Sequence, residues 1–441
     1  MHSTEEILQW MESLRKEIYV HIRQVPLEET TNWHYSAQDG GIVHDSRSFF
    51  QIKGIQRNEC GQTFEQPIIV QNEIGYLGII CKEFYGTLYF LMQAKIEPGN
   101  VNTVQISPTI QATKSNFMRS HKGATPPYLE YFDELNRHEI IVDQIQSEQS
   151  SRFYQKRNRN IIIKINEEIP ILPQFIWMTL GQIKQLMRHD NLINMDTRTV
   201  ISCLPFSLRQ YKPEDLARIQ PLFTNEPFYR SVFFGQNGFG FQQAFHYINS
   251  QKMFDQTNTR LIDLYALKDW RMEGNTFLTD HADFNVIFCD IEIEGREVRR
   301  WAQPLLRAIS ESIFGLMCCI KDGCMLFLVQ TISEVGCFDK MEFGPSVQNY
   351  PCAPDRSVVS ELFFERLNKK QGILFSGILS EEGGRFYHEQ NQNVILMIDW
   401  NDLPELPKGY FWMDYNSLNV LVQFNNYLNI QLRNLLALLS L

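Results

Sequence analysis

The chain has 441 residues, of which 44% are hydrophobic and 12% are aromatic. Since a single core rarely organises so long a chain, we expect two domains of roughly 200 residues each. The formal charge of −10 argues against a nucleic-acid partner held by phosphate contacts, so any bound anion would need a local basic cluster.

Targeting and cysteine features narrow the class of protein further. No secretory signal opens the sequence, and the apolar end, Leu435–Leu441, is too short to span a bilayer. Nine cysteines are scattered without the spacing of a zinc site, and Cys318 and Cys319 lie in an apolar run typical of buried thiols. These features predict a soluble, cytoplasmic protein with no membrane partner and no metal site.

The first elements along the chain are an amphipathic helix and a β-rich region. Ser3 and Glu6 have the spacing of a capping box, and apolar residues follow at intervals of three or four up to Ile22. Short apolar runs then predict strands. Among them, Tyr76–Lys82 and Thr87–Lys95 flank a turn and predict a hairpin.

Two more strands and a helix complete the first half. Apolar runs over Ile140–Ile145 and Asn160–Ile165 have the length of strands. After two prolines, apolar residues from Leu180 to Met187 mark one face of a helix. The same order returns later, with strands up to about Met397, two prolines and a helix. Each half is therefore predicted to be a mixed α+β unit, a curved sheet with helices at its ends.

The two halves are copies of one another. Residues of the first half recur at nearly constant intervals, namely Trp33, Gln66, Pro67, Gly78, Gln93, Pro108, Gln111, Trp177, Asn194 and Arg198 as Trp270, Gln303, Pro304, Gly315, Gln330, Pro345, Gln348, Trp412, Asn429 and Arg433. So long a unit indicates a duplicated domain rather than a solenoid repeat. We expect the first copy at 1–205. The connection and the second copy would occupy 206–441, with the second leading helix before about residue 269.

Polar side chains gather in two parts of the first copy. Amides and hydroxyls are dense along Gln93–Asn100 and Gln105–Asn116, and a strand face of this kind suits a sugar or a nucleoside. Cations between residues 152 and 159 suit phosphate. The plainer interpretation is that a run such as Lys156–Arg159 is a solvated surface.

The repeat helps to decide between these interpretations. The second copy replaces four cations of the first, since Lys95, Lys156, Arg157 and Arg159 correspond to Ile332, Glu389, Gln390 and Gln392. The simplest account is that the first copy binds a charged ligand and the second does not. Glu97, Glu148 and Arg152 persist as Glu334, Glu381 and Arg385, which favours a structural role for the glutamates and would leave some anion affinity in the second copy.

Three segments together resemble a known enzyme family. They are QAKIEPGNVNTVQISPTIQATKSNFMRSHKG (Gln93–Gly123), QSEQSSRFYQKRNRN (Gln146–Asn160) and the stretch from Phe175 to Thr199. They look like the NDP-hexose 2,3-dehydratases of deoxysugar biosynthesis. The resemblance implies a dTDP-4-keto-6-deoxyhexose substrate and a 3,4-diketo-2,6-dideoxy product. It also implies tandem Nudix-like modules in a homodimer, with one functional pocket and one relic pocket per subunit.

The chemistry of such a dehydration sets the groups that a site must supply. The C4 ketone acidifies the C3 proton, and the C2 hydroxyl, which is β to that ketone, leaves as water. The protein must supply a base, a proton donor and a cation or hydrogen-bond donor for the enolate oxygen. Because oxidation at C3 and loss at C2 cancel, no redox cofactor is needed, and no glycine-rich dinucleotide motif is present.

The polar stretches provide candidates for these roles. We expect Glu97, Glu148 and His121 to include the acid and the base, with Lys95 on the enolate or on phosphate. Expected substrate-binding residues are Trp33, Gln111, Thr113, Asn116, Arg119, Tyr128, Arg152, Tyr154, Lys156 and Arg157. Trp33 recurs and could belong to the core instead, whereas Asn194, Asp196 and Arg198 are expected to fix a helix.

Three other functions remain open from the sequence. A Nudix-like sugar-nucleotide hydrolase would need a carboxylate-bearing helix that holds Mg²⁺, and neither half contains the Gly-x5-Glu-x7-Arg-Glu-x2-Glu-Glu pattern. A non-catalytic sugar-nucleotide binding module would need only the binding half of the cluster. A purely structural tandem module would not explain why cations vanish from one copy.

Overall fold

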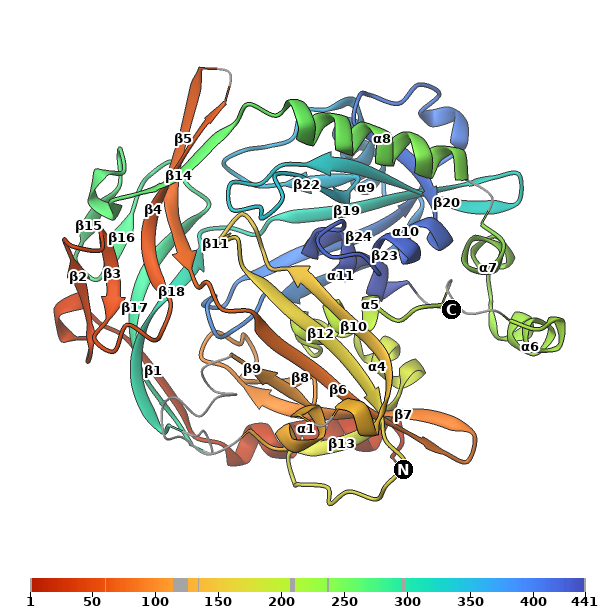
Figure 1. Cartoon of the computed structure of the whole chain (residues 1–441), viewed down its shortest axis with the longest axis horizontal. Helices are drawn as coiled ribbons and strands as arrows, with labels where there is room; N and C mark the ends of the chain where they lie inside the picture. The colour runs from red at the N-terminus through yellow and green to blue at the C-terminus, as the bar shows by residue number, and fades with distance from the viewer. Residues whose placement is uncertain are drawn as a thin grey trace.

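The computed structural model describes residues 2–59, 61–113, 126–133, 135–206, 211–235, 238–294 and 298–439. Over these residues the protein is mixed α+β, as predicted, with strands in four sheets. In Figure 1 one seven-stranded sheet lies in the lower part of the molecule and another at the upper right, while long strands run down the left edge.

The lower sheet, which we call sheet 1, belongs to the first half of the chain. Its strand order is β10-β12-β6-β7-β13, with β8 on β7 and β9 on β6. Its strands are β6 (Gly75–Phe84), β7 (Thr87–Ile96), β8 (Val104–Ser107), β9 (Ile110–Ala112), β10 (Glu139–Ser147), β12 (Arg157–Lys164) and β13 (Phe175–Thr179). The predicted hairpin and the two predicted later strands are confirmed. Strand β13, directly before the predicted helix, was not foreseen.

The upper sheet, sheet 2, repeats this arrangement in the second half. Its strands are β19 (Ile313–Lys321), β20 (Cys324–Ile332), β21 (Glu342–Pro345), β22 (Val347–Asn349), β23 (Ile373–Ser380), β24 (Gln390–Met397) and β25 (Tyr410–Asp414). The order is β23-β24-β19-β20-β25, with β21 on β20 and β22 on β19. Even the register matches, because Gly78 pairs with Ile110 and the corresponding Gly315 pairs with Val347.

The recurring glycines of β6 and β19 have a packing reason. A Cβ on Gly78 would lie 2.6 Å from the ring of Phe132, and one on Gly315 would lie 2.4 Å from the ring of Phe363. These rings belong to α3 (Leu129–Asp133) and α9 (Val358–Asn368), which cover corresponding faces of the two sheets. Only glycine lets an aromatic ring approach the strand so closely.

The long strands at the left of Figure 1 belong to two further sheets. Sheet 3 has the order β11-β5-β4-β3-β2 with β14 on β4, and sheet 4 has the order β1-β17-β16-β15 with β18 on β17. Sheet 3 comprises β2 (Trp33–Ser36), β3 (Gly41–His44), β4 (Gln51–Glu59), β5 (Gln62–Val70), β11 (Phe153–Tyr154) and β14 (Asn258–Ile262). Sheet 4 comprises β1 (Val20–Gln24), β15 (Arg271–Glu273), β16 (Thr276–Leu278), β17 (Phe284–Ile293) and β18 (Arg300–Ala308).

The two halves exchange their leading strands. In the sequence repeat β1 corresponds to β14, yet β1 pairs with β17 of the second half, Val20 opposite Ile293. Reciprocally, β14 pairs with β4 of the first half, Ile262 opposite Gly54. Each half therefore completes a sheet of the other. The boundary near residue 205 stays a prediction, and the segments on its two sides are interlocked.

Helices occupy the ends and the middle of the molecule. Helix α1 (Thr4–Glu17) begins with the predicted capping box of Ser3 and Glu6, and α8 (Gly238–Phe254) lies where the second leading helix was expected. The remaining helices are α4 (Leu180–Leu186), α5 (Met195–Ser202), α6 (Pro213–Ile219), α7 (Glu226–Phe233), α10 (Tyr415–Leu421) and α11 (Ile430–Leu438), with 3-10 turns η1 (Leu27–Glu29), η2 (Leu135–Arg137), η3 (Gln220–Leu222), η4 (Leu264–Ala266) and η5 (Trp400–Asp402). The prediction that the first helix reaches Ile22 is wrong, since Ile22 pairs in β1 with β17.

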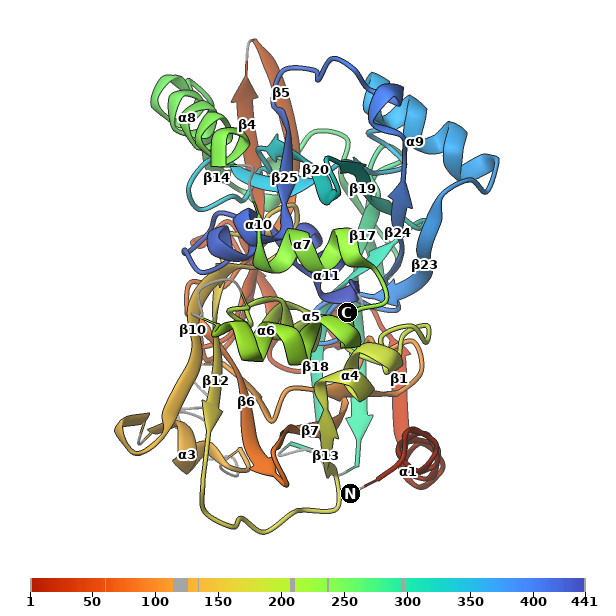
Figure 2. The same ribbon diagram turned by 90° about the vertical axis from the view of Figure 1, so that its right-hand side faces the viewer.

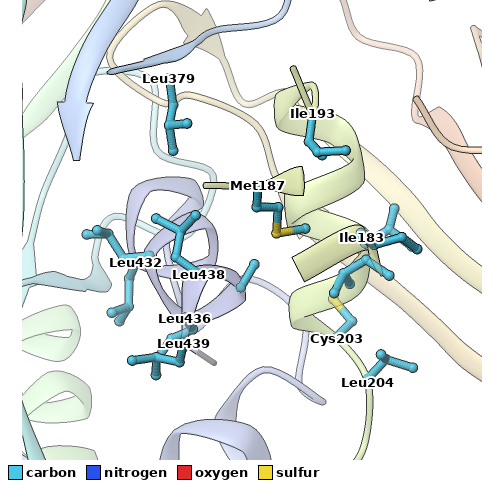
Figure 3. Close-up of a cluster of buried hydrophobic side chains, with 14 of the residues drawn as sticks. Ile183, Met187, Ile193, Cys203, Leu204, Leu379, Leu432, Leu436, Leu438 and Leu439 are labelled. Carbon is cyan, nitrogen blue, oxygen red and sulfur yellow. The ribbon is translucent and has the colours of Figure 1, made fainter. Parts of the chain in front are cut away.

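The two halves meet at α5 and α11. Figure 2 shows both helices in the middle of the molecule, between sheet 1 below and sheet 2 above. Figure 3 draws Met187 and Ile193 of the first half together with Leu432 and Leu438 of the second, and all four side chains belong to one buried cluster. Burial of this apolar surface joins the halves into one core.

Reciprocal hydrogen bonds reinforce this junction. The buried guanidinium of Arg198 donates to the carbonyl of Ser380 at 2.8 Å, and that of Arg433 donates to the carbonyl of the corresponding Ser147. Asn194 accepts a hydrogen bond from the backbone N–H of Thr197 at 2.8 Å and so caps α5. The prediction that Asn194 and Arg198 fix a helix is confirmed, and the arginine ties that helix to the other half.

Two other features of the described residues bear on the predictions. None of the helices in these ranges combines the length and the apolar character needed to cross a membrane. The eight described cysteines are all free, and Cys318 and Cys319 are buried thiols, as predicted.

Candidate functional site

A cavity of about 640 Å³ lies between sheet 1 and the long strands of sheets 3 and 4. Strands β6, β7, β9 and β12 of the first half line one side of it. The opposite side comes from the β17–β18 hairpin and from the loop that follows β23, both in the second half. The cavity is therefore built from both halves of the chain.

An ion pair stands at the end of β7. The Nζ atom of Lys95 lies 3.3 Å from Oε1 of Glu97 and donates to the carbonyl of Gln111 at 3.0 Å. Glu97 directly follows the strand, and only 8% of its surface is exposed. A partly buried ammonium beside a cavity can stabilise negative charge that develops on a bound molecule.

A second pair of charges lies where β10 and β12 meet. Glu148 follows β10 and accepts a hydrogen bond from the side-chain amide of Asn158. Burial raises the pKa of Glu148, although Lys156 opposes this effect. Burial also lowers the pKa of Lys156 to about 8, and its ammonium donates to the carbonyl of Glu73 at 2.6 Å. Both groups thus have pKa values closer to neutrality than usual, as is common in active sites.

Two more carboxyl groups complete this end of the cavity. Asp196 lies in the first turn of α5, and its burial, together with the charges of Glu148 and Glu382, raises its pKa well above the usual range. Glu382 comes from the second half. Its Oε1 accepts hydrogen bonds from the N–H of Gly384 at 2.6 Å and from the amide of Gln111 at 3.5 Å. Burial, and then the neighbouring Glu97, raise the pKa of Glu382.

The other end of the cavity carries aromatic rings and two arginines, of which Arg300 pairs with the carboxylate of Asp290 at 2.8 Å. Trp33, Phe50 and Trp301 line it together with Arg300. The indole N–H of Trp33 donates to the carbonyl of Ala302 at 2.7 Å, which joins the first half to β18. The guanidinium of Arg385 lies 4.1 Å from the centre of the Phe50 ring. Flat rings beside guanidinium groups suit a nucleotide base with its phosphates.

The structure brings seven of the predicted site residues together around this cavity. They are Trp33, Lys95, Glu97, Gln111, Thr113, Glu148 and Lys156. Trp33 is also largely buried among Phe50 and other apolar residues, so the core interpretation holds as well. Asn116, Arg119 and His121 lie outside the described residues.

Four predicted binding residues do not line the cavity. Tyr128 is a core residue whose hydroxyl donates to the carbonyl of Pro170 at 2.8 Å. Tyr154 pairs in β11 and packs against a small apolar cluster. The guanidinium groups of Arg152 and Arg157 lie over the rings of Phe284 and Phe338, at 4.1 and 3.7 Å from the ring centres.

The sequence reasoning missed the contribution of the second half. Glu382, Arg385, Arg300 and Trp301 line the cavity, and Asp196, expected only to fix a helix, lines it too. One signal was present in the repeat, because Asp196 corresponds to Gln431 and Glu382 corresponds to Gln149. The same comparison that singled out Lys95 could have singled out both carboxyl groups.

The corresponding place in the second half is occupied by its own side chains. Glu334, the counterpart of Glu97, accepts hydrogen bonds from the amide of Gln348 at 2.6 Å and from the hydroxyl of Tyr350 at 3.1 Å. Tyr350 stands where the first half has Thr113. Arg152 lies 5.9 Å from the Tyr350 ring, so it serves this second cluster rather than the cavity. Burial raises the pKa of Glu334.

Comparison with known proteins places the chain among relatives of similar length. The family described as NDP-hexose 2,3-dehydratase matches residues 4–204 and 242–439. A dTDP-4-dehydro-6-deoxy-alpha-D-glucopyranose 2,3-dehydratase of Saccharopolyspora spinosa is 35% identical over 445 residues, covering 99% of this chain and 91% of that protein. Proteins of the same description from Amycolatopsis orientalis and Streptomyces violaceoruber are 32% and 33% identical, covering 99% and 94% of this chain and 90% and 92% of their own.

Proposed function

This chain belongs to the NDP-hexose 2,3-dehydratase family, and we propose that it removes water from C2 and C3 of a dTDP-4-keto-6-deoxyhexose. The product would be the dTDP-3,4-diketo-2,6-dideoxyhexose. The observation that supports this most directly is a cavity in which carboxyl groups, two lysines and aromatic rings converge. That combination offers acid–base groups for the sugar and a flat surface for the base.

We assign Glu148 as the base that takes the C3 proton. Its pKa is raised by burial, and a base works best on a carbon acid when its pKa is near the working pH. Lys95, beside Glu97 at the cavity wall, would stabilise the enolate oxygen at C4. Because the elimination is redox-neutral, the proposal requires neither a nicotinamide nor another cofactor.

The aromatic and basic end of the cavity would hold the nucleotide. Trp33 and Trp301 line it from the two halves and would stack on thymine. Arg385, over Phe50, would take the pyrophosphate by charge-assisted hydrogen bonds, with Arg300 close by on the same wall. In this orientation the sugar lies against Lys95 and Glu148.

Several finer statements belong to the same proposal. We propose that the enzyme is a hydro-lyase, that the cavity lined by Lys95 and Glu148 is the active one, and that its two units are Nudix-like. The homodimer is supported by the family resemblance alone. Free cysteines at the eight described positions fit a reducing compartment and support a cytoplasmic location.

Incubation with dTDP-4-keto-6-deoxyglucose tests the proposed reaction. We expect mass spectrometry to show a product lighter by one water, formed equally well with EDTA and without added nicotinamide. Release of a nucleoside monophosphate, dependent on a divalent cation, would instead indicate a hydrolase. Binding without turnover would indicate a sugar-nucleotide binding module.

A further inference from the structure

We propose that Glu382, supplied by the second half of the chain, donates the proton to the departing C2 hydroxyl. This inference rests on the proposed dehydratase function and adds the group that the first half lacks. With Glu148 as base and Lys95 as enolate stabiliser, a proton donor remains to be named. Glu382 lines the same cavity as both of these groups.

The loop that carries Glu382 is held rigidly against the first half. The N–H of Gly99 donates to the carbonyl of Gly383 at 2.7 Å, and the N–H of His388 donates to the carbonyl of Gly99 at 2.9 Å. A Cβ on Gly99 would lie 1.6 Å from the carbonyl oxygen of Phe386, so the approach requires glycine. A Cβ on Gly383 would lie 2.9 Å from Cβ of Glu97, so this backbone contact brings the loop that carries Glu382 close to Glu97.

The corresponding loop of the first half docks in the same way. The N–H of Gly336 donates to the carbonyl of Ser150 at 2.7 Å, and the N–H of Gln155 donates to the carbonyl of Gly336 at 2.7 Å. At the position of Glu382, however, this loop carries Gln149. The scaffold is common to both places, and at this loop position the cavity has an ionisable carboxyl group where the second cluster has an amide.

The surroundings of Glu382 favour its protonated form. Burial disfavours the carboxylate, and the nearby charges of Glu97 and Glu148 act in the same direction, with Arg385 opposing them. Among the described residues, the hydrogen bonds from the N–H of Gly384 and the amide of Gln111 both go to Oε1. Oε2 is therefore the atom that would carry the proton.

The proposed step balances in atoms and electrons. Glu148 takes the proton from C3, and the electron pair of the C3–H bond forms the enolate with C4. When the C4 carbonyl re-forms, a C2–C3 double bond forms and the C2–O bond breaks. The proton on Oε2 of Glu382 joins the leaving hydroxyl as water. The enol at C3 then becomes the ketone, because its hydroxyl releases a proton to solvent while C2 gains one. Solvent restores the two carboxyl groups.

Solvent exchange separates a proton donor from the base. In D₂O, Glu382→Gln should lose turnover by about 10²–10⁴-fold, yet it should still exchange the C3 hydrogen of dTDP-4-keto-6-deoxyglucose for deuterium. Binding of dTDP should be unchanged. Glu334→Gln is the matched control, because it alters a buried carboxyl group of the second cluster. This variant should keep both turnover and exchange of the C3 hydrogen.

Each outcome decides between the proposals. Near-normal turnover by Glu382→Gln, or loss of exchange together with turnover, would overturn the role of Glu382. A wild-type protein that neither eliminates nor exchanges would instead refute the dehydratase proposal. If Glu382→Gln fails to fold or to bind dTDP, Glu382→Asp keeps a proton donor. It should restore turnover with a shifted alkaline limb of the kcat–pH profile, and an unshifted limb would contradict the proposal.

Discussion

The cavity of the first half and the corresponding cluster of the second share a scaffold and differ in their reactive groups. In both places a glycine loop docks against the other half, and an asparagine donates to a buried glutamate, Asn158 to Glu148 and Asn391 to Glu381. The differences lie in side chains that line the space. Thr113 is replaced by Tyr350, which fills it and bonds to Glu334.

This contrast shows that a site which differs in its reactive groups need not be formed by one continuous half of the sequence. Each of the two places is built from both halves, because loops and leading strands are exchanged. Arg152 of the first half lies in the second cluster, and Arg385 of the second half lines the cavity. A residue must therefore be assigned to a site by its position in space rather than by the half to which it belongs.

The strongest test of the contrast compares two corresponding glutamates. Glu148 lines the cavity, whereas Glu381 is its counterpart in the second half. We expect Glu148→Gln to lower kcat by about 10²–10⁴-fold and to abolish C3 exchange, since it removes the base. Glu381→Gln should keep turnover. Steady-state kinetics and deuterium incorporation measure both effects. If Glu148→Gln keeps turnover while Glu97→Gln loses it, the base is Glu97.

A smaller effect is expected from replacing Arg385, which lines the cavity, or its counterpart Arg152, which lies in the second cluster. Arg385→Ala should weaken binding of the substrate and of dTDP by roughly 1.5–3 kcal/mol, because a charge-assisted contact to phosphate is lost. Arg152→Ala and Arg157→Ala should leave dTDP affinity unchanged, since both guanidinium groups lie over rings away from the cavity. Calorimetric titration with dTDP gives the affinities. Weaker binding by Arg152→Ala alone would show that the anion site is in the second cluster.

The smallest expected effect is on how stability depends on pH, and it concerns Lys156 and its counterpart Glu389. Burial lowers the pKa of Lys156 to about 8 in the folded protein, so between that pH and its unfolded pKa near 10.5 the unfolded chain binds more protons. The contribution of Lys156 to the free energy of unfolding therefore rises with pH in that window, by at most about 1.4 kcal/mol per pH unit. Lys156→Met should remove the rise, as measured by urea unfolding from pH 7 to 10.

The counterpart of Lys156 should behave in the opposite sense. Burial raises the pKa of Glu389 above its usual value, so the folded protein binds more protons than the unfolded chain just above pH 4.5. Its contribution to stability therefore falls as pH rises through that window, and Glu389→Gln should remove the fall. Parallel pH profiles for wild type and both variants would contradict the assigned burial of these charges.

The sequence predicted much of the site because its two copies can be compared with one another. Lys95 and Lys156 were found as charges present in one copy and absent from the other, and both line the cavity. Arg157 followed the same rule, but its guanidinium packs over Phe338 in the neighbouring loop. A change of charge between copies marks a difference in surroundings. It does not say whether that difference concerns a ligand or an aromatic neighbour.

By itself the sequence showed the internal repeat and predicted the α+β class and most strands of sheet 1, since these follow from local periodicity and from residues recurring at nearly constant intervals. Only the tertiary structure decided whether a residue lines the cavity or belongs to the second cluster. Strands β4 and β17 correspond to one another and offer similar edges, so nothing local tells β1 which of them to join. That choice depends on how the whole chain packs, and it brings Glu382 and Arg385 to a cavity that the first half cannot complete alone.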